Sequence, residues 1–214
     1  MDSEKAVVNL FTPGLEMTPE IAVKLRESGL YNLIIGIYSS EPALHDKIRG
    51  ISGAHEKALH AIRMAQEAGL MVTMACQVKS GDVDRIPELY NFAASVGVQE
   101  LSIWEGIPLT AEEQLTQIER EKIIELYRSI NSTPGGPRLF ASTYFEGQML
   151  GCMAGRRWLH VGVDGNVRAC PYLEKSYGNV FDIPIKDIWK TIRSSGEYDD
   201  FDCNCPAQRA FINY

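Results

Sequence analysis

The stretch CMAGRRWLHVGVDGNVRAC, residues 152–170, begins and ends with a cysteine and carries an Asp-Gly pair between two apolar runs. Asp164-Gly165 in this setting is a strong short-range signal for a β-hairpin. We therefore expect two short antiparallel strands, over residues 158–163 and 166–170. Because the turn reverses the chain, the hairpin can place Cys152 and Cys170 beside one another.

The cysteines are grouped along the chain. Four of the five lie in its last third, namely Cys152, Cys170, Cys203 and Cys205. Four thiolates around one centre suit either Zn²⁺ or an iron–sulfur cluster. Structural zinc sites mostly take their ligands from paired C-x₂₋₄-C motifs. Cys152 and Cys170 are too far apart in the sequence to form such a motif, so this pattern fits poorly. The alternative is four unrelated thiols. We expect the fifth cysteine, Cys76, to be a small buried hydrophobic residue.

The composition is that of an ordinary globular protein, with 214 residues, 45% of them hydrophobic and 23% charged. A formal net charge of −7 argues against a nucleic-acid-binding face as the main function. No apolar run approaches the ~20 residues needed to span a bilayer. The polar start of the sequence lacks the features of a signal peptide. We therefore expect no membrane insertion, and a cytoplasmic protein whose thiols stay reduced.

Up to about residue 131, short apolar runs alternate with amphipathic stretches, which predicts an α/β fold with four βα units and a parallel sheet. The expected strands are residues 6–11, 33–38, 71–77 and 100–104, and the expected helices span about 18–28, 54–68, 86–96 and 116–131. Thr18-Pro19 and Thr116 with Glu119 are N-terminal capping signals.

The Pro/Gly-rich residues 132–137 favour a domain boundary near residue 140. Four parallel strands in residues 1–140 leave two open edges or an unfinished barrel. The alternative is a small open α/β sheet whose edges are covered by the C-terminal segment. Residues 141–214 are expected to form a small hairpin-and-helix domain, with a helix that begins near Pro184.

The pattern of Cys152, Gly165 and Cys170, followed by residues 178–180 (GNV) and 185–189 (IKDIW), resembles the SPASM/twitch domain of radical S-adenosylmethionine (SAM) enzymes. Residues 45–50 (HDKIRG), 68–72 (AGLMV), 10–15 (LFTPGL) and 94–98 (ASVGV) resemble the barrel of the same family.

This resemblance implies a partial radical SAM-like barrel in residues 1–140 and an auxiliary-cluster domain in residues 141–214. It also implies that Cys152 and Cys170 ligate an auxiliary [4Fe–4S] cluster, with Cys203 and Cys205 as the remaining ligands. The C-x-C of Cys203 and Cys205, followed by Pro206, departs from the longer cysteine run of the family.

The C-x₃-C-x₂-C loop, whose cluster cleaves SAM in this family, is not in the sequence, and the first 75 residues contain no cysteine. We therefore expect an excised fragment, a truncated gene or a split enzyme whose barrel a separate chain completes. Whether the chain is an enzyme is left open, and it is expected to be inactive alone, with SAM bound only if the other half is supplied.

Candidates for contacts with SAM follow the second and third predicted strands. In the family, the residue at the position of Ser39 often contacts the SAM ribose; the alternative for Ser39 is a plain loop. Gln77 ends the next strand, where it would face SAM or the substrate; the alternative for Gln77 is a capping or loop role. Trp104 and Glu105 end the fourth predicted strand. Their side chains could line the lumen of the barrel, and the default for Trp104 is packing in the core. We expect His45 and His60 to lie at the surface, and no histidine to be a metal ligand.

The resemblance implies the C-terminal part of a maturase-type enzyme, in which the auxiliary cluster assists substrate binding or electron transfer. The substrate would be a peptide or a small molecule. One alternative is a non-catalytic peptide-binding module stabilised by zinc or a cluster. Another is a complete small α/β protein without a metal.

Overall fold

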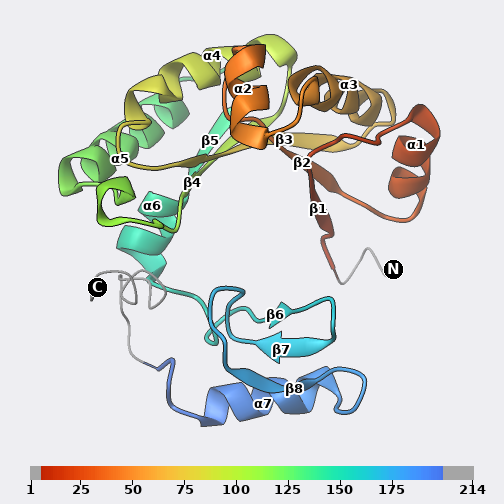
Figure 1. Cartoon of the computed structure of the whole chain (residues 1–214), viewed down its shortest axis with the longest axis vertical. Coiled ribbons are helices and arrows are strands. Elements are labelled where there is room, and N and C mark those ends of the chain that lie inside the picture. Colours follow the sequence, from red (N-terminus) through yellow and green to blue (C-terminus); the bar gives the residue numbers. More distant parts are fainter. Residues whose placement is uncertain (1–5, 200–214) are drawn as a thin grey trace. The chain divides into compact units, whose positions relative to one another are not determined.

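The computed structural model describes residues 6–199. The chain folds into two compact units (Figure 1). Unit 1 comprises the chain up to Gly106 together with Leu115–Ser142. Unit 2 comprises Ile107–Gln114 together with the chain from Thr143 onward. No helix within residues 6–199 has the length and apolar character that crossing a bilayer requires.

Unit 1 is built on five parallel strands that follow one another across the sheet in sequence order. These are β1 (Asn9–Thr12), β2 (Asn32–Gly36), β3 (Met71–Val78), β4 (Glu100–Glu105) and β5 (Arg138–Ala141). The connecting helices are α1 (Pro19–Glu27), α2 (Pro42–Arg49), α3 (Ala54–Glu67), α4 (Ile86–Val96) and α5 (Gln117–Ser132). Because the strand order never reverses, right-handed crossovers place these helices on one face of a curved sheet, as Figure 1 shows. The predicted α/β class with a partial barrel is confirmed.

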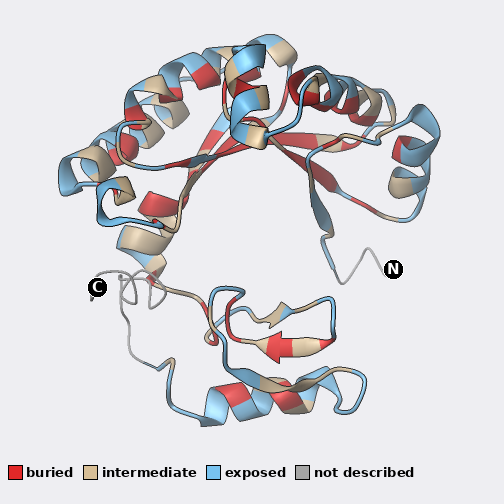
Figure 2. Cartoon of the chain, viewed as in Figure 1, coloured by how far each residue is buried: buried red, intermediate tan, exposed pale blue. Residues whose placement is uncertain are grey.

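The core of unit 1 lies between the sheet and the helices (Figure 2). Side chains alternate between the two faces of a strand, so Leu33 and Ile35 share the face that packs against α3. Both are fully buried, as are Met74 and Leu101 on the neighbouring strands. The opposite face carries Phe11, Trp104 and Phe140, and the Trp104 ring contacts the other two rings.

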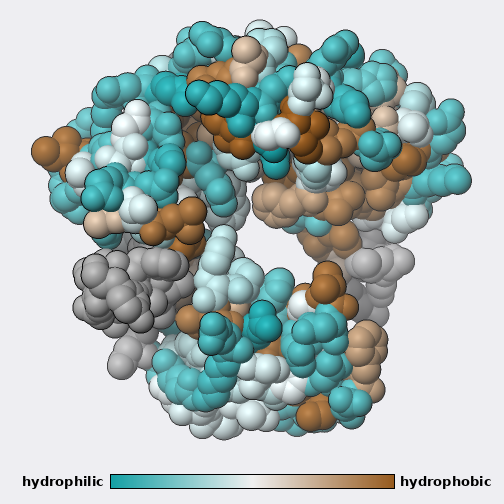
Figure 3. Space-filling model, viewed as in Figure 1, coloured by the Kyte–Doolittle hydropathy of each residue, from teal (hydrophilic) through white to brown (hydrophobic). Residues whose placement is uncertain are grey.

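Strand β1 is an edge of the sheet, and the apolar side chains on it and just before it are largely exposed. Val7, Leu10 and Phe11 are 69%, 36% and 61% exposed. Figure 3 shows hydrophobic surface in this part of unit 1. An uncovered edge strand is a pairing site for further polypeptide.

Strand β5 and helix α2 of unit 1 were not predicted. Strand β5 follows the Pro/Gly-rich stretch and pairs with β4, with Arg138 opposite Glu100. Helix α2 lies in a segment for which no helix was predicted, with Pro42 in its first turn and Gly50 in the left-handed conformation at its end. Both elements are short, so neither shows a long enough period to stand out in the sequence.

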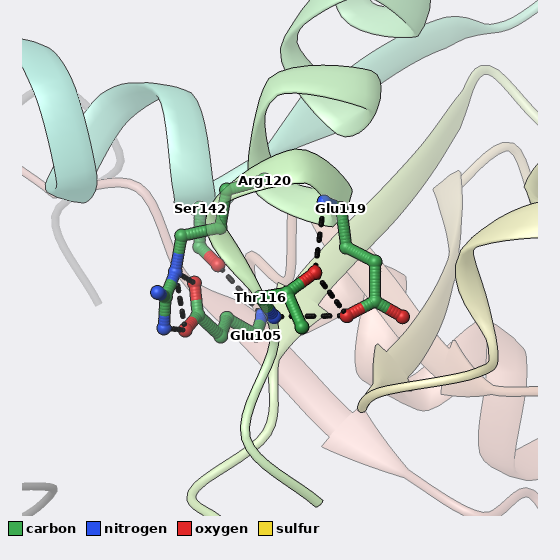
Figure 4. A network of polar contacts seen from close by, with 5 residues as sticks. All are labelled: Glu105, Thr116, Glu119, Arg120 and Ser142. Carbon is green, nitrogen blue, oxygen red and sulfur yellow. Dashed lines mark hydrogen bonds and ion pairs between the residues drawn. The ribbon is translucent and has the colours of Figure 1, made fainter.

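The start of α5 fastens the helix to the loop after β3 (Figure 4). The Thr116 hydroxyl accepts a hydrogen bond from the Glu119 N–H (3.2 Å), and a Glu119 carboxylate oxygen accepts one from the Thr116 N–H (2.8 Å). This confirms the predicted capping box. The other Glu119 oxygen accepts from the Gly81 N–H (2.7 Å). Glu119 therefore caps one element and anchors another.

Glu105 joins the carboxyl ends of β4 and β5 to the same helix. Arg120 Nε lies 3.0 and 3.3 Å from the two Glu105 carboxylate oxygens, and the Glu105 N–H donates to Ser142 Oγ (2.8 Å). Figure 4 shows these contacts beside the capping box. The loops at this edge of the sheet are thus held in place by α5.

Unit 2 contains a three-stranded antiparallel sheet of β6 (His160–Val161), β7 (Asn166–Arg168) and β8 (Ser176–Asn179). The predicted hairpin is confirmed, with His160 opposite Arg168 and Val161 opposite Val167. Helix α7 (Ile185–Ser194) covers the sheet through Ile188 and Ile192. The remaining short elements are η1 (Val83–Arg85), η2 (Ala111–Glu113), α6 (Ser142–Tyr144) and η3 (Phe145–Leu150).

Gly165→Ala is expected to destabilise unit 2. Gly165 has a φ of 81°, and a Cβ there would lie 2.6 Å from the Phe181 ring and 2.7 Å from Asn179 Oδ1. The left-handed conformation alone costs an alanine about 1–2 kcal/mol. Urea unfolding followed by circular dichroism measures the loss. Gly147→Ala, where an added Cβ meets nothing within 4 Å, is the control. Equal stability of the two variants would contradict the expectation.

Glu119→Gln is expected to lower stability near neutral pH by about 1 kcal/mol, because a neutral amide accepts backbone hydrogen bonds more weakly than a carboxylate does. The N–H groups of Gly81 and Thr116 lower the pKa of Glu119 from 4.5 to about 2. Its carboxylate therefore stabilises the fold above pH 4.5, and this contribution is lost as the pH falls towards 2.

Urea unfolding of both proteins at a series of pH values tests this. The difference between wild type and Glu119→Gln should shrink through the acidic range, while Glu125→Gln on the same helix serves as control. A difference that stays constant with pH would show that the charge of Glu119 contributes nothing.

Candidate functional site

The two described cysteines of unit 2 lie in one small apolar region. Cys170 is 8% exposed and forms a buried cluster with Ala154 and Ala169. Half-buried Cys152 packs against this cluster. The hairpin between them returns the chain, so residues 18 positions apart share one small apolar region. Cys203 and Cys205 lie outside the described residues.

This region fits part of a thiolate ligand set. Within residues 6–199, no group of three or more His, Cys, Asp or Glu side chains could hold a metal ion. The described part of unit 2 therefore offers two thiols, and the other two ligands of a four-thiolate site have to come from elsewhere. The surroundings of the two thiols, Ala154, Ala169 and Leu173, form the kind of apolar shell that limits water at a metal site.

Cys76 is a different kind of cysteine. It lies on β3 in unit 1 and is 4% exposed. Burial, together with the nearby charge of Asp82, raises the pKa of its thiol to about 12. The side chain therefore stays protonated at neutral pH, which confirms its prediction as a small buried hydrophobic residue.

Ser39 and Gln77 both lie at the carboxyl edge of the sheet in unit 1, because β2 and β3 are parallel neighbours. Ser39 is 3% exposed, and its hydroxyl accepts a hydrogen bond from the Glu41 N–H (3.0 Å). Gln77 is exposed and pairs in register with Trp104. Gln77 thus presents a side chain at this edge, whereas the Ser39 hydroxyl is occupied within its own turn.

The expectation that His45 lies at the surface is wrong, whereas His60 is exposed as predicted. His45 is on α2 and 1% exposed, and its Nδ1 accepts the N–H of Tyr38 (3.2 Å). Its ring contacts that of His55, 4% exposed, with 5.4 Å between the centroids. Burial, followed by the charges of His55 and Arg49, lowers the pKa of His45 to about 4. A neutral imidazole thus holds the turn that leads to Ser39.

Trp104 and Glu105 face opposite sides of the sheet. The Trp104 ring lies 6.4 Å from that of Phe11 and 5.1 Å from that of Phe140. Its Nε1 has no hydrogen-bond partner among the described residues. Glu105 is bound by Arg120. The expectation that Glu105 lines the lumen is therefore wrong, because side chains alternate along the strand and the carboxylate turns towards α5.

A protein-family model matches part of unit 2. Residues 152–213 match the SPASM model, described as an iron–sulfur cluster-binding domain. The match begins at Cys152 and includes the hairpin, Cys170, Cys203 and Cys205.

Curated relatives cover nearly the whole chain. An "AdoMet-dependent heme synthase" of Methanosarcina barkeri is 23% identical over 209 residues, covering 86% of this chain and 60% of the relative. A "PqqA peptide cyclase" of Streptomyces rochei is 27% identical over 211 residues, covering 90% of this chain and 57% of the relative. The chain spans little more than half the length of such relatives.

Solved structures agree on the fold. Streptococcus suis SuiB bound to S-adenosylmethionine has a TM-score of 0.68 at 13% identity and is similar over 94% of this chain and 53% of its own. The structure of anSMEcpe with bound AdoMet and Kp18Cys peptide has a TM-score of 0.64 at 17% identity, over 88% and 59%. Together with the partial parallel barrel and the paired cysteines, these similarities show that the chain resembles the C-terminal portion of radical SAM enzymes that carry a SPASM iron–sulfur domain.

Proposed function

We propose that this chain is the C-terminal part of a radical SAM maturase-type enzyme and carries its auxiliary [4Fe–4S] cluster. Residues 141–214 would form the cluster domain, and residues 1–140 part of the SAM-binding barrel. The observation that carries the proposal is the packing of Cys152 and Cys170 into one buried region, within the segment that matches the SPASM domain. Cys203 and Cys205 are proposed as the remaining ligands.

A cluster held by thiolates supplies either an electron relay or a binding position for the substrate. The chain itself provides the thiolates and the apolar shell of Ala154, Ala169 and Leu173, which limits water at the site. In unit 1, the carboxyl edge of the sheet would contribute to SAM binding through Gln77 and the turn at Ser39. Barrel enzymes assemble their active sites at this edge.

The SAM-cleaving half would pair with β1. This strand is an open edge with exposed apolar side chains, and the sequence contains no C-x₃-C-x₂-C motif. The chain covers 60% of the heme synthase relative and 57% of the peptide cyclase relative. We propose that additional strands, from the same polypeptide or a separate chain, extend the sheet there.

The proposed substrate is a peptide or a small molecule. Support for a peptide comes from relatives named PqqA peptide cyclase and from a similar structure described as SuiB bound to precursor peptide SuiA. Support for a small molecule comes from relatives named heme synthase. The net charge of −7 argues against a nucleic acid as the partner, because phosphate contacts depend on a basic binding surface. A cytoplasmic location stays a prediction.

After anaerobic reconstitution with iron and sulfide, the wild-type chain is expected to hold about four irons and to absorb near roughly 400 nm. Cys152→Ser and Cys170→Ser should each lose most of this iron, because a cluster with a missing thiolate ligand is poorly held. Iron and sulfide analysis after gel filtration measures the outcome.

Cys76→Ala is the matched control, since this buried thiol lies on β3 in unit 1, and it should keep the wild-type iron content. An iron-free, zinc-loaded wild-type protein would instead support the zinc-stabilised peptide-binding module. Iron retained in both Cys152→Ser and Cys170→Ser would remove these residues from the ligand set.

The chain alone, incubated anaerobically with SAM and a strong reductant, is expected to form no 5′-deoxyadenosine. The sequence lacks the three-cysteine loop on which SAM cleavage depends in the family. Chromatography of the reaction mixture against a protein-free control provides the measurement. Product above that control would show that this chain holds a SAM-cleaving centre of its own.

A further inference from the structure

Two tyrosines stand beside the cysteines of unit 2. Tyr177 belongs to β8, and Tyr198 follows α7. Their rings meet edge to face, with 6.3 Å between the centroids. Both rings pack against the buried cluster that contains Cys170 and that Cys152 also contacts. The region proposed to hold the metal cluster therefore has an aromatic side.

The Tyr198 ring is closely fitted to the loop that begins at Cys152. A Cβ on Gly155 would lie 2.4 Å from Tyr198 Cδ2, closer than side chains ever approach. Gly155 also has a φ of 65°, in the left-handed region that favours glycine. Glycine at this position allows the ring to lie directly on the backbone three residues after Cys152.

A chain of hydrogen bonds holds the two tyrosines together. The Tyr177 hydroxyl donates to Glu197 Oε2 (2.9 Å), and the Tyr177 and Tyr198 hydroxyl oxygens lie 2.9 Å apart. Since Tyr177 has only one hydroxyl proton, Tyr198 is the donor in this pair. Lys175 pairs with Glu197 and lies 4.8 Å from the centroid of the Tyr177 ring. Glu197 thus accepts a hydrogen bond from Tyr177, and the Tyr177 oxygen in turn accepts one from Tyr198.

A second set of contacts fixes the same segment. Arg193 donates from Nη1 to the Gly155 carbonyl (3.0 Å) and from Nη2 to Asp199 Oδ1 (3.2 Å). One guanidinium therefore links the Gly155 backbone, on one side of the Tyr198 contact, to the Asp199 side chain, on the other. The position of the Tyr198 ring does not rest on its hydroxyl alone.

We propose that Tyr198 and Tyr177 form an aromatic wall of the iron–sulfur site. As positioning residues, they fix the loop carrying Cys152 against Cys170 and exclude water from one side of the cluster. The apolar shell around a metal site controls its solvent access and its reduction potential. This inference rests on the proposed function, because it presupposes a cluster on Cys152 and Cys170.

Tyr198→Ala and Tyr198→Phe separate the ring from the hydroxyl. After anaerobic reconstitution, Tyr198→Ala is expected to lose iron to a chelator about 10-fold faster than wild type or more, in line with other outer-shell contacts. Its reduction potential, from a titration followed by electron paramagnetic resonance, should shift to more positive values as water reaches the cluster. Tyr198→Phe, which keeps the ring, should match wild type in both measurements.

A wild-type rate of iron loss and reduction potential in Tyr198→Ala would contradict the proposed aromatic wall. So would changes in Tyr198→Phe as large as those in Tyr198→Ala. If circular dichroism shows that Tyr198→Ala does not fold, Tyr198→Leu is measured instead. Faster iron loss from Tyr198→Leu than from wild type supports the aromatic wall, and loss at the wild-type rate contradicts it. Tyr31→Ala, which removes a 56% exposed tyrosine from unit 1, is the control. A wild-type chain that takes up no iron would refute the proposed function itself, and this inference with it.

Discussion

The tight turn at Gly165 is the constraint on which unit 2 depends. The Gly165 N–H donates to the Gly162 carbonyl (2.9 Å), which closes the hairpin, and the Gly165 carbonyl accepts from Val180 (3.0 Å), which brings in β8. The left-handed φ that permits this geometry is open to glycine at little cost. Through the turn, Cys170 returns to Cys152, and Tyr177 on β8 reaches the same buried region. The arrangement of the two cysteines and of their surroundings thus follows from one local backbone conformation.

Unit 1 was predictable where local signals decide structure. Thr116 with Glu119 and Thr18 with Pro19 mark helix starts through hydrogen bonds between near neighbours, and both starts are found. Strand β5 and strand β8 were missed, because four residues give too short a pattern and their pairing depends on strands distant in sequence. Helix α2 was missed for the same reason of length.

The candidate site was predictable only in part. Cysteine grouping and the Asp164-Gly165 signal led to Cys152 and Cys170, because turn chemistry is local. His45 was placed at the surface, although tertiary packing buries it against Tyr38 and His55. No sequence pattern pointed to Tyr198. Its ring packs on Gly155, which is distant in sequence, and this contact is possible only because glycine has no side chain. The four-thiolate ligand set stays a prediction, as Cys203 and Cys205 lie outside the described residues.

The central claim is that four thiolates of unit 2 hold one iron–sulfur cluster. Native mass spectrometry of the anaerobically reconstituted chain tests it most directly, because the mass identifies the bound atoms and the protons lost from the thiols. The account predicts one species heavier than the bare chain by a single [4Fe–4S] cluster, absent from Cys170→Ser and present in Cys76→Ala. A species carrying zinc, or the bare chain alone, would contradict it.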